Sequence, residues 1–471
     1  MKKLTKIVAT ISDKRCDIEF LKNLFDAGVN VVRLNTAHAN FESATKIIEN
    51  VRKVSSKIAI LIDTKGPEIR TTKNEQDFEL KTGDRIIFKG NPDGISSKDC
   101  IYSTYKGLAT DVPVGTLILI DDGEIAFKVE SKDDEKLTCV VQNDGIIKSR
   151  KSINIPGVHI NLPSISEKDI AFINYAIDVD ATFIAHSFVR NKHDVLALKE
   201  ILAERNSDIK IIAKIENQQG VDNIDEILDH VYGIMIARGD LGIEVAAEKI
   251  PIIQKLLNKK CIRRRKPVIV ATQMLHTMIE NPRPTRAEVS DVANAIYDGT
   301  DAIMLSGETA FGNYPIEAVQ TMTKIAQEVE LYKREHEQFV ELPHNDRITK
   351  FLSHSAVQAS VELNVRAIIA DSISGSTIRN LAAFRSSKPI YAMCYTEKVM
   401  RELALSYGVY VEHIEQRKST DEFFNTSVSL LINKKMLEID DIVVVLAGNF
   451  GPGTGASFIE ISTAHNLIKR Y

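Results

Sequence analysis

Residues 209–240 read IKIIAKIENQQGVDNIDEILDHVYGIMIARGD, and this stretch decides the fold. Two near-continuous apolar runs, 209–216 and 232–240, flank a segment whose apolar residues have helical spacing, as in a strand–helix–strand unit of a parallel sheet. Runs that are apolar at almost every position are typical of strands buried on both faces. Both runs nevertheless end on charged side chains, which indicates a polar site at one edge of the sheet.

The same pattern recurs along the chain. Eight β-rich runs alternate with helical patterns, at residues 6–10, 29–36, 58–65, 181–188, 209–216, 232–240, 267–274 and 302–308. Eight such units predict an α/β fold, the (β/α)₈ TIM barrel, in which the carboxyl ends of all strands face one mouth. Several runs end on polar groups: Arg33 and Asn35, Asp63 and Lys65, Lys214 and Glu216, Arg238 and Asp240, Thr272 and Gln273, Ser306 and Glu308.

Two further domains are predicted. From about Pro67 to Leu162, short strands and turn signals such as NPDG and DDGE replace the helical pattern, which indicates an inserted all-β domain. Such a domain is either a lid over the barrel mouth or a mere addition to its rim. A second α/β pattern follows the barrel, with strand-like runs at residues 366–371, 389–393 and 441–448. We predict a barrel at 1–66 and 164–345, an inserted domain at 67–163 and a C-terminal α/β domain at 346–471.

The composition excludes several classes of function. A chain of 471 residues with 44% hydrophobic residues can bury a large core, and its net charge of −4 gives no overall field that attracts nucleic acid or an anionic membrane. No segment reaches the roughly 18 to 20 apolar residues of a membrane span, and no signal peptide is evident. The five cysteines lie far apart without a CxxC pair, which favours a reduced, cytoplasmic protein.

Lys214 and Glu216 form the centre of the predicted site. Strand alternation puts both side chains on one face, while Ile215 points to the other. Asp240 ends the next run, so Glu216 and Asp240 could share a Mg²⁺ ion, which favours one or two carboxylates. A buried salt-bridge cluster without metal is the alternative. Gly239 would let an anion approach the backbone closely.

Other polar groups extend this site. Arg33, Lys65 and Arg70 supply positive charge suited to phosphate or carboxylate. Asn35, Asp63 and Thr64 supply oxygens suited to a second, larger cation. The common P-loop and protein-kinase motifs are absent from the sequence.

The segment 372–377, SISGST, follows a predicted strand of the C-terminal domain and leads into a helix. A Ser/Thr/Gly turn at a helix N-terminus presents backbone N–H groups to an anion. Ordinary helix capping would explain the same residues. The residue types leave both interpretations open.

The chain resembles the pyruvate kinase family over nearly its whole length. The matching segments include RLNTAHA (33–39), LIDTKGPEIRT (61–71), AKIENQQG (213–220), MIARGDLGIE (235–244), ATQML (271–275) and the very specific NPRPTRAEVSDVANAIYDGTDAIMLSGETAFGNYP (281–315). The resemblance implies transfer of the phosphoryl group of phosphoenolpyruvate to ADP, giving pyruvate and ATP, the final step of glycolysis. It also implies Mg²⁺ or Mn²⁺, usually with K⁺.

The resemblance further implies roles for single residues. Lys214 would stabilise the transferring phosphoryl group and the enolate, and Glu216 and Asp240 would bind Mg²⁺. Substrate contacts would come from Arg33, Lys214, Gly239, Asp240 and Thr272. Nucleotide contacts would come from Asn35, His38, Arg70 and Lys151. The potassium site would use Asn35, Asp63 and Thr64, and enolate protonation would use Thr272 with Ser306 and Glu308.

Regulation and assembly are implied in the same way. Ser372, Ser374, Gly375, Ser376 and Thr377 fall on the family's effector phosphate turn, which implies an allosteric sugar-phosphate ligand. The family also implies a homotetramer. Ala37 stands where the family usually has Ser, so one oxygen of the potassium site is lost.

Two other functions fit parts of the pattern. An aldolase acting on a pyruvate-like enolate would use Lys214 as a Schiff base or the metal as a Lewis acid. A non-catalytic metabolite sensor would keep the fold and lose the chemistry, and its expected sign is loss of the lysine or of a metal ligand.

Overall fold

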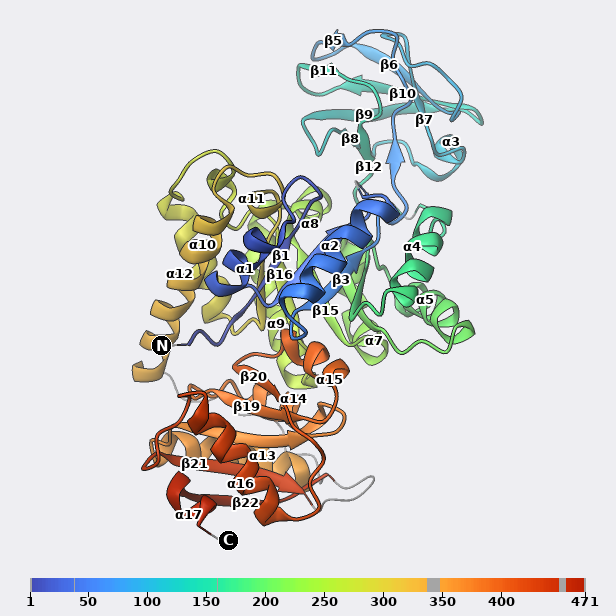
Figure 1. Cartoon of the computed structure of the whole chain (residues 1–471). Helices are drawn as coiled ribbons and strands as arrows, with labels where there is room; N and C mark the ends of the chain where they lie inside the picture. The colour runs from blue at the N-terminus through green and yellow to red at the C-terminus, as the bar shows by residue number, and fades with distance from the viewer. Residues whose placement is uncertain (1, 38, 159, 337–347, 449–454, 470–471) are drawn as a thin grey trace.

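The computed structural model describes residues 2–37, 39–158, 160–336, 348–448 and 455–469. A central barrel lies between a β-rich part at one end and an α/β part at the other (Figure 1). The β-rich part comprises the elements between β3 and α4, and the α/β part begins after α12.

Eight parallel strands close into the barrel, in the order β1-β17-β16-β15-β14-β13-β3-β2. They are β1 (Lys6–Thr10), β2 (Val31–Asn35), β3 (Ala59–Asp63), β13 (Phe183–His186), β14 (Lys210–Ile215), β15 (Gly233–Ala237), β16 (Val268–Ala271) and β17 (Ala302–Leu305). The predicted TIM barrel is confirmed. Most strands are shorter than the predicted runs, so many of the polar residues that ended those runs lie in loops at the mouth.

Side chains of the barrel strands alternate between two apolar layers. The inner layer includes Val31, Leu61, Phe183, Ile212 and Met235, and Leu405 from the C-terminal part joins it at the base. The outer layer packs against the helices and includes Ile7, Ile60, Ile184, Ile215 and Ile236. This alternation fixes which side chains reach the inside of the mouth.

Helices surround the barrel. They are α1 (Ile18–Ala27), α2 (Phe41–Val54), α4 (Glu167–Asp178), α5 (Lys192–Glu204), α6 (Gln218–Asp222), α7 (Ile224–His230), α8 (Arg238–Glu244), α9 (Ile250–Arg264), α10 (Arg286–Tyr297), α11 (Gly307–Ala310) and α12 (Pro315–His336), with short 3₁₀ turns at Ala247–Lys249 and His276–Ile279. Capping boxes begin α2, α4 and α10, because their N-cap and N3 side chains bind each other's backbone N–H groups. Within the described residues, no helix is both long and apolar enough to cross a membrane.

The inserted part has a core of its own. Seven strands form one sheet in the order β4-β12-β8-β9-β10-β6-β7, and β11 pairs with β5. The elements are β4 (Ile69–Arg70), β5 (Phe78–Leu80), β6 (Arg85–Gly90), β7 (Cys100–Ser103), α3 (Leu108–Asp111), β8 (Leu117–Ile120), β9 (Ile125–Lys132), β10 (Lys136–Val141), β11 (Gly145–Ile147) and β12 (Ser152–Asn154). Phe88 and Phe127 pack edge to face at its centre, with ring centroids 5.0 Å apart.

The C-terminal part is a five-stranded sheet in the order β20-β19-β18-β21-β22, with apolar clusters on both faces. Its elements are α13 (Ile348–Glu362), β18 (Ala367–Ser372), α14 (Ser376–Ala383), β19 (Ile390–Cys394), α15 (Glu397–Glu402), a 3₁₀ turn at Leu403–Leu405, β20 (Val409–His413), α16 (Thr420–Asn433), β21 (Ile442–Gly448), β22 (Ala456–Thr463) and α17 (Ala464–Ile468). Strands β18, β19 and β21 match predicted runs. Strands β20 and β22 were not predicted, and β22 is an antiparallel edge strand.

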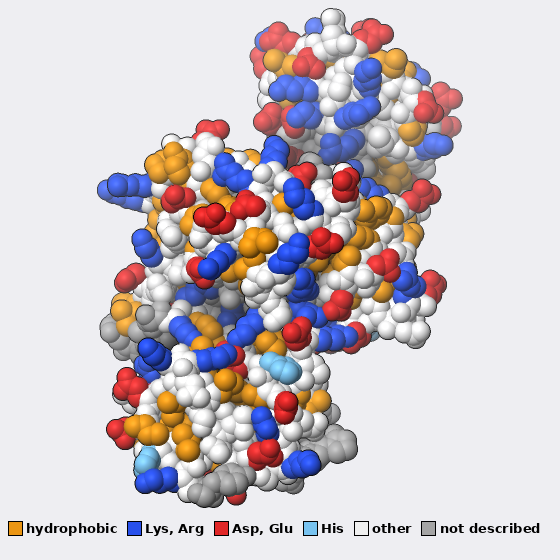
Figure 2. Space-filling model, viewed as in Figure 1, with side chains coloured by type: hydrophobic (Ala, Val, Ile, Leu, Met, Phe, Trp, Pro, Cys, Tyr) orange, Lys and Arg blue, Asp and Glu red, His pale blue; other side chains and the backbone are white. Residues whose placement is uncertain are grey.

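Charged side chains are mixed over the surface. On the face shown in Figure 2, basic and acidic groups alternate across all three parts of the molecule. This distribution agrees with the small net charge of −4. Binding of an anionic substrate must therefore depend on local groups.

Candidate active site

Lys214 points into the barrel mouth. Ile212 belongs to the inner apolar layer and Ile215 to the outer one, so Lys214 shares the inner face with Ile212. Its ammonium nitrogen lies 3.2 Å from Asp63 Oδ1 and 2.9 Å from Glu216 Oε1. Burial opposes the charged form, but the carboxylates of Asp63 and Glu216 outweigh it and raise the pKa of Lys214. Lys214 is therefore a fixed positive charge.

Ser187 lies at the centre of the same cluster. Its hydroxyl accepts a hydrogen bond of 2.8 Å from Lys214 Nζ and donates one of 2.6 Å to the carbonyl of Thr64. No role was predicted for Ser187. Strand alternation could have found it, because Ser187 follows Phe183 and Ala185 at inner-layer positions.

Glu216 and Asp240 form a carboxylate pair. Burial raises the pKa of both groups, and each lies close enough to affect the other. Glu216 Oε2 accepts the backbone N–H of Phe188 at 2.7 Å. Glu216 Oε1 is buried and, although close to Lys214 Nζ, accepts no well-directed hydrogen bond from a described residue.

This pair fits a divalent cation, because an unsatisfied, buried carboxylate oxygen and a second nearby carboxylate are the ligands that Mg²⁺ favours. Among the described residues, no group of three or more acidic, His or Cys side chains could hold a metal. The two carboxylates would therefore need substrate oxygens and water to complete the coordination.

Arg33 is held beside Lys214 by Asp63. Its Nε donates to Asp63 Oδ2 at 2.6 Å, and its Nη1 donates to Thr10 Oγ1 at 2.9 Å. Arg33 and Lys214 together lower the pKa of Asp63, despite its burial. The remaining N–H groups of Arg33 have no hydrogen-bond partner in the described part of the chain, so they are available to an anion.

The three predicted potassium ligands are only partly oriented for a cation. Asn35 and Asp63 are register partners on β2 and β3, which brings their side chains together. Asn35 Oδ1 accepts the N–H of Ala37 at 3.1 Å. The hydroxyl of Thr64 faces β13, where it donates to Ala185 O and accepts from Ser187 N. These side chains do not form a ready set of free oxygens, so the potassium site stays a prediction.

Thr272 and Gly239 meet across two neighbouring strand ends. Gly239 N donates to Thr272 Oγ1 at 2.7 Å, and that hydroxyl lies 2.6 Å from Ala271 O. Thr272 has φ +72°, an outlier for a β-branched residue and a strain typical of functional sites. A Cβ on Gly239 would make only ordinary contacts of 3.5 Å or more with Thr272. Protein packing therefore does not require a glycine here, which leaves the space open to a ligand.

Ser306 and Glu308 lie at the end of β17. Glu308 is buried, and its two carboxylate oxygens accept the N–H groups of Leu275 and Ser306 at 3.2 and 2.8 Å. This geometry holds the loop after β17 against the loop after β16. The proton relay through Ser306 and Glu308 stays a prediction.

Two of the predicted nucleotide contacts, Arg70 and Lys151, belong to the inserted part. Arg70 binds Glu68 at 2.6 Å and the carbonyl of Arg150 at 2.7 Å. Lys151 binds Asp121 Oδ1 at 2.8 Å, within the inserted part. Asn35 is at the barrel mouth, and His38 lies outside the described residues.

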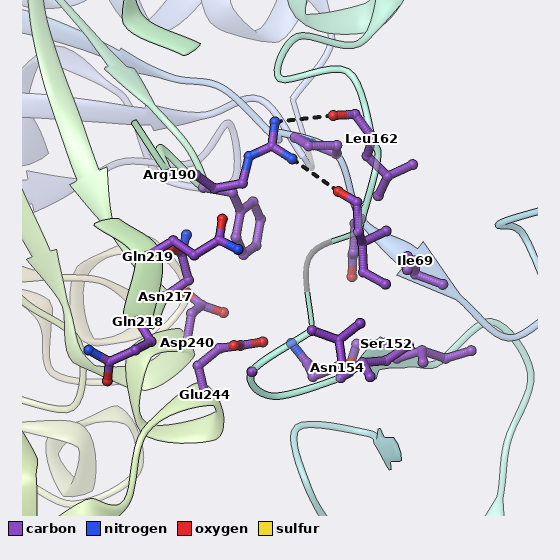
Figure 3. A pocket seen from close by; sticks show the side chains of 18 of the residues that line it. Ile69, Ser152, Asn154, Leu162, Arg190, Asn217, Gln218, Gln219, Asp240 and Glu244 are labelled. Carbon is purple, nitrogen blue, oxygen red and sulfur yellow. Dashed lines mark hydrogen bonds between the residues drawn. The ribbon is translucent and has the colours of Figure 1, made fainter. Parts of the chain in front are cut away.

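A cavity of about 320 Å³ separates the inserted part from the barrel mouth. Asp240, Glu244 and Asn217 line it from the barrel, and Ser152 and Asn154 face them from the inserted part (Figure 3). The cavity thus lies between Asp240, one of the two carboxylates, and the inserted domain.

A side-chain hydrogen bond closes the predicted effector turn. Ser372 Oγ accepts the N–H of Gly375 at 2.8 Å, and Gly375 has φ +76°, which favours glycine. No side chain of the turn makes the usual N-cap hydrogen bond to helix α14, which follows directly. The effector role of these residues stays a prediction.

Comparisons with known proteins agree over the whole chain. A family model described as the pyruvate kinase barrel domain matches residues 2–319, and one described as the pyruvate kinase alpha/beta domain matches residues 350–461. A pyruvate kinase of Borreliella burgdorferi is 50% identical, covering 99% of this chain and 98% of that protein. A pyruvate kinase of Bacillus licheniformis is 44% identical over 99% of this chain and 81% of its own. A solved pyruvate kinase of Cryptosporidium parvum superposes with a TM-score of 0.91 at 35% identity, over 98% and 96% of the two chains.

Proposed function

The chain belongs to the pyruvate kinase family, and we propose that its reaction takes place where Lys214, Glu216 and Asp240 meet at the barrel mouth. It is a phosphotransferase that moves the phosphoryl group of phosphoenolpyruvate to ADP, giving pyruvate and ATP in glycolysis. The observation that carries the placement is the Lys214 ammonium, 3.2 Å from Asp63 Oδ1 and 2.9 Å from Glu216 Oε1.

Lys214 and Arg33 neutralise negative charge in this proposal. Phosphoryl transfer depends mainly on positioning and on stabilising charge that develops on the transferring group. Lys214 keeps its proton because of Asp63 and Glu216, so it can bind the phosphoryl oxygens and then the enolate oxygen. Arg33 presents its free N–H groups from the same cluster.

Glu216 and Asp240 would hold the divalent cation, Mg²⁺ or Mn²⁺. When bound, the cation supplies positive charge to the phosphoryl oxygens and orients them. Gly239 and Thr272 border the same space and would contact the substrate through backbone and hydroxyl. The strained backbone at Thr272 keeps its hydroxyl beside Gly239.

The last step adds a proton to the enolate carbon. Because the Thr272 hydroxyl is oriented toward Ala271 O, it would have to turn to donate elsewhere. We propose that the Thr272 hydroxyl delivers this proton and that a water relay past Ser306 and Glu308 supplies it. The ordinary pKa of an aliphatic hydroxyl is too high for it to act as a general acid without such a relay.

The aldolase alternative is disfavoured by the charge of Lys214. A Schiff base requires the neutral amine, whereas two carboxylates raise the pKa of Lys214. The sensor alternative predicts loss of the lysine or a metal ligand, and all three residues are present.

The remaining assignments extend the proposal. Arg70, Lys151, Asn35 and His38 would contact ADP once the inserted domain closes on the mouth. Asn35, Asp63 and Thr64 would hold K⁺ weakly, since Ala37 lacks a hydroxyl. A sugar phosphate would bind the turn of Ser372, Ser374, Gly375, Ser376 and Thr377, and the enzyme would assemble as a homotetramer.

A coupled assay tests the function directly. Pyruvate formation from phosphoenolpyruvate and ADP is measured at fixed Mg²⁺ while K⁺ is varied against Na⁺. We expect Mg²⁺-dependent turnover with a weak response to K⁺. Absence of ADP-dependent turnover would refute the function, and a strong, saturable K⁺ response would refute the weakened potassium site.

A further inference from the structure

Arg190 ties the barrel to the segment by which the chain leaves the inserted domain. Its Nη1 donates to the carbonyl of Ile160 and its Nη2 to the carbonyl of Leu162, each at 3.1 Å (dashed lines in Figure 3). The side chain is 18% exposed and lines the cavity between the two parts. None of the roles assigned to the active site uses this arginine.

Asp194 fixes the arginine in this orientation. Its carboxylate accepts Nε at 3.1 Å and Nη2 at 3.0 Å, and it also accepts the backbone N–H of Arg190 at 2.9 Å. The planar guanidinium is thus held on one edge by a carboxylate while its other donors reach two carbonyls. Binding a carboxylate on one edge and two carbonyls on the other requires the planar, fixed array of N–H donors that arginine has and lysine lacks.

The backbone beneath Arg190 is equally constrained. Asn223 Nδ2 donates to the carbonyl of Arg190 at 3.0 Å. A Cβ on Gly220 would lie 2.6 Å from the carbonyl of Val189, so helix α6, which follows β14, packs directly against this segment. Arg190 therefore extends from a rigid base.

The segment 187–190, which ends at Arg190, also contacts the proposed active site. Ser187 accepts from Lys214, and the N–H of Phe188 binds Glu216. Phe188 has φ +53°, a left-handed conformation that a bulky residue rarely adopts. One turn thus contacts the lysine, a metal ligand and the inserted domain.

The entry to the inserted domain is held by a different residue. Asp169 Oδ1, at the start of α4, accepts the N–H of Lys65 at 2.8 Å, and that of Gly66 lies 3.4 Å away. The entry is held through its backbone N–H groups and the exit through its carbonyls. Loss of Arg190 would release only the exit.

We propose that Arg190 is a positioning residue, whose fork on Ile160 and Leu162 keeps the inserted domain at the distance from Glu216 and Asp240 that binding of ADP requires. Without the fork, only a fraction of molecules would hold the inserted domain correctly. Apparent affinity falls by that fraction, whereas the rate from the assembled complex does not. The inference rests on the proposed function for its kinetic test only.

The test compares Arg190→Met with Arg205→Met. Arg205 also pairs with an aspartate, Asp178 at 2.8 Å, but on the outer surface of the barrel. For Arg190→Met we expect the KM for ADP to rise about tenfold, with kcat changed less than about threefold, if the competent fraction falls to about a tenth. Deuterium uptake around Ile160 and Leu162 should rise in the same variant. Arg205→Met should match the wild type in both measurements.

Two further variants distinguish the loss of the guanidinium geometry from the loss of charge and from misfolding. Arg190→Lys keeps the charge but lacks the fork, so its KM for ADP should also rise, and a wild-type KM would overturn the proposal. If Arg190→Met does not fold, Asp194→Asn takes its place. The KM for ADP of that variant must then rise, by less than about tenfold, and deuterium uptake around Ile160 and Leu162 must also rise. An unchanged Asp194→Asn, or a fall in kcat with constant KM, would overturn it as well.

Different results would refute the proposed function and the role of Arg190. A wild-type protein without turnover of phosphoenolpyruvate and ADP would refute that function. Hydrogen exchange at Ile160 and Leu162 in the variants would still decide whether Arg190 holds the exit segment.

Discussion

At the scale of single residues, the site depends on how charges compensate one another. Lys214, Arg33, Asp63 and Glu216 form an alternating buried cluster, in which each charge has an opposite neighbour. Removing one member leaves its partners buried and uncompensated. Function and stability are therefore coupled at these positions.

Lys214→Met should lower kcat by about 10³-fold, the range seen when one preorganised donor to a developing negative charge is lost. Binding of Mn²⁺ to Glu216 and Asp240, followed by electron paramagnetic resonance, should remain. Lys210→Met is the matched control, because Lys210 begins the same strand at the opposite end of the barrel. A rate loss below about tenfold in Lys214→Met would remove the lysine from its assigned role.

His186 is the last residue of β13 and is fully enclosed. Neither ring nitrogen has a hydrogen-bond partner among the described residues. Burial lowers the pKa of His186 to about 4, against the opposing pull of the Asp194 and Asp169 carboxylates. The folded protein thus binds this proton less tightly than the unfolded chain, whose histidine titrates near 6.5.

The stability due to neutral His186 should be present above about pH 6.5 and be lost as the pH falls toward 4. Between pH 7 and pH 5, the wild type should lose about 2 kcal/mol of unfolding free energy more than His186→Leu, measured by urea denaturation. The leucine variant should be nearly as stable at pH 7, since it breaks no hydrogen bond. Parallel pH dependences of the two proteins would show that His186 does not titrate in this way.

At the scale of elements, the proposed site combines side chains on the strands with side chains just beyond their ends. Lys214 lies on β14, whereas Glu216 follows that strand and Asp240 lies in helix α8. The turn after β13 and helix α6, which follows β14, are packed against each other through Val189 and Gly220. A change in one of these segments must therefore move the other.

Gly220→Ala should destabilise the protein by about 1–3 kcal/mol, because its Cβ would lie 2.6 Å from the carbonyl of Val189. The displaced turn should also lower kcat through Ser187 and Phe188. Gly242→Ala is the control, since a Cβ there meets nothing within 4 Å in helix α8, and we expect a gain of up to about 1 kcal/mol. Urea denaturation and the coupled assay measure both effects, and equal stability of the two variants would contradict the packing argument.

At the scale of the whole molecule, the C-terminal part closes the base of the barrel. Leu405 completes the inner apolar layer. Arg385 binds both oxygens of Asp301 at 3.1 and 2.7 Å, and the two side chains are 6% and 5% exposed. Asp301 also accepts the backbone N–H of Tyr407, so one buried carboxylate joins barrel and C-terminal part.

Arg385→Met should lower the free energy of unfolding by about 3–5 kcal/mol, because it leaves the Asp301 carboxylate buried without its cation. Lys398→Met breaks an ion pair with Asp208 between the same two parts, but those side chains are 46% and 64% exposed. That control should cost less than about 1 kcal/mol. Denaturant unfolding followed by circular dichroism tests the difference, and similar losses would mean that the buried pair does not join the parts.

Sequence patterns predicted the features that depend on neighbouring residues. Alternation with a period of two placed Lys214 and Glu216 on one face, and the repeated runs predicted the barrel and its mouth. They missed β20 and β22 because both are edge strands without a continuous buried apolar run: β20 ends on Glu412 and His413, and β22 has polar residues throughout. Those strands depend on pairing with β19 and β21, which no local pattern records.

The sequence by itself determined the eight-strand barrel, the inserted and C-terminal domains, and the polar residues at the strand ends. Tertiary structure alone decided which of them touch. Ser187 reaches Lys214 across 27 positions, and Arg190 reaches the exit of the inserted domain across 30 and 28. Alternation along a strand is local, so the sequence alone placed Lys214 and Glu216 on one face, whereas the partners of these side chains depend on the closure of the barrel and the packing of its loops.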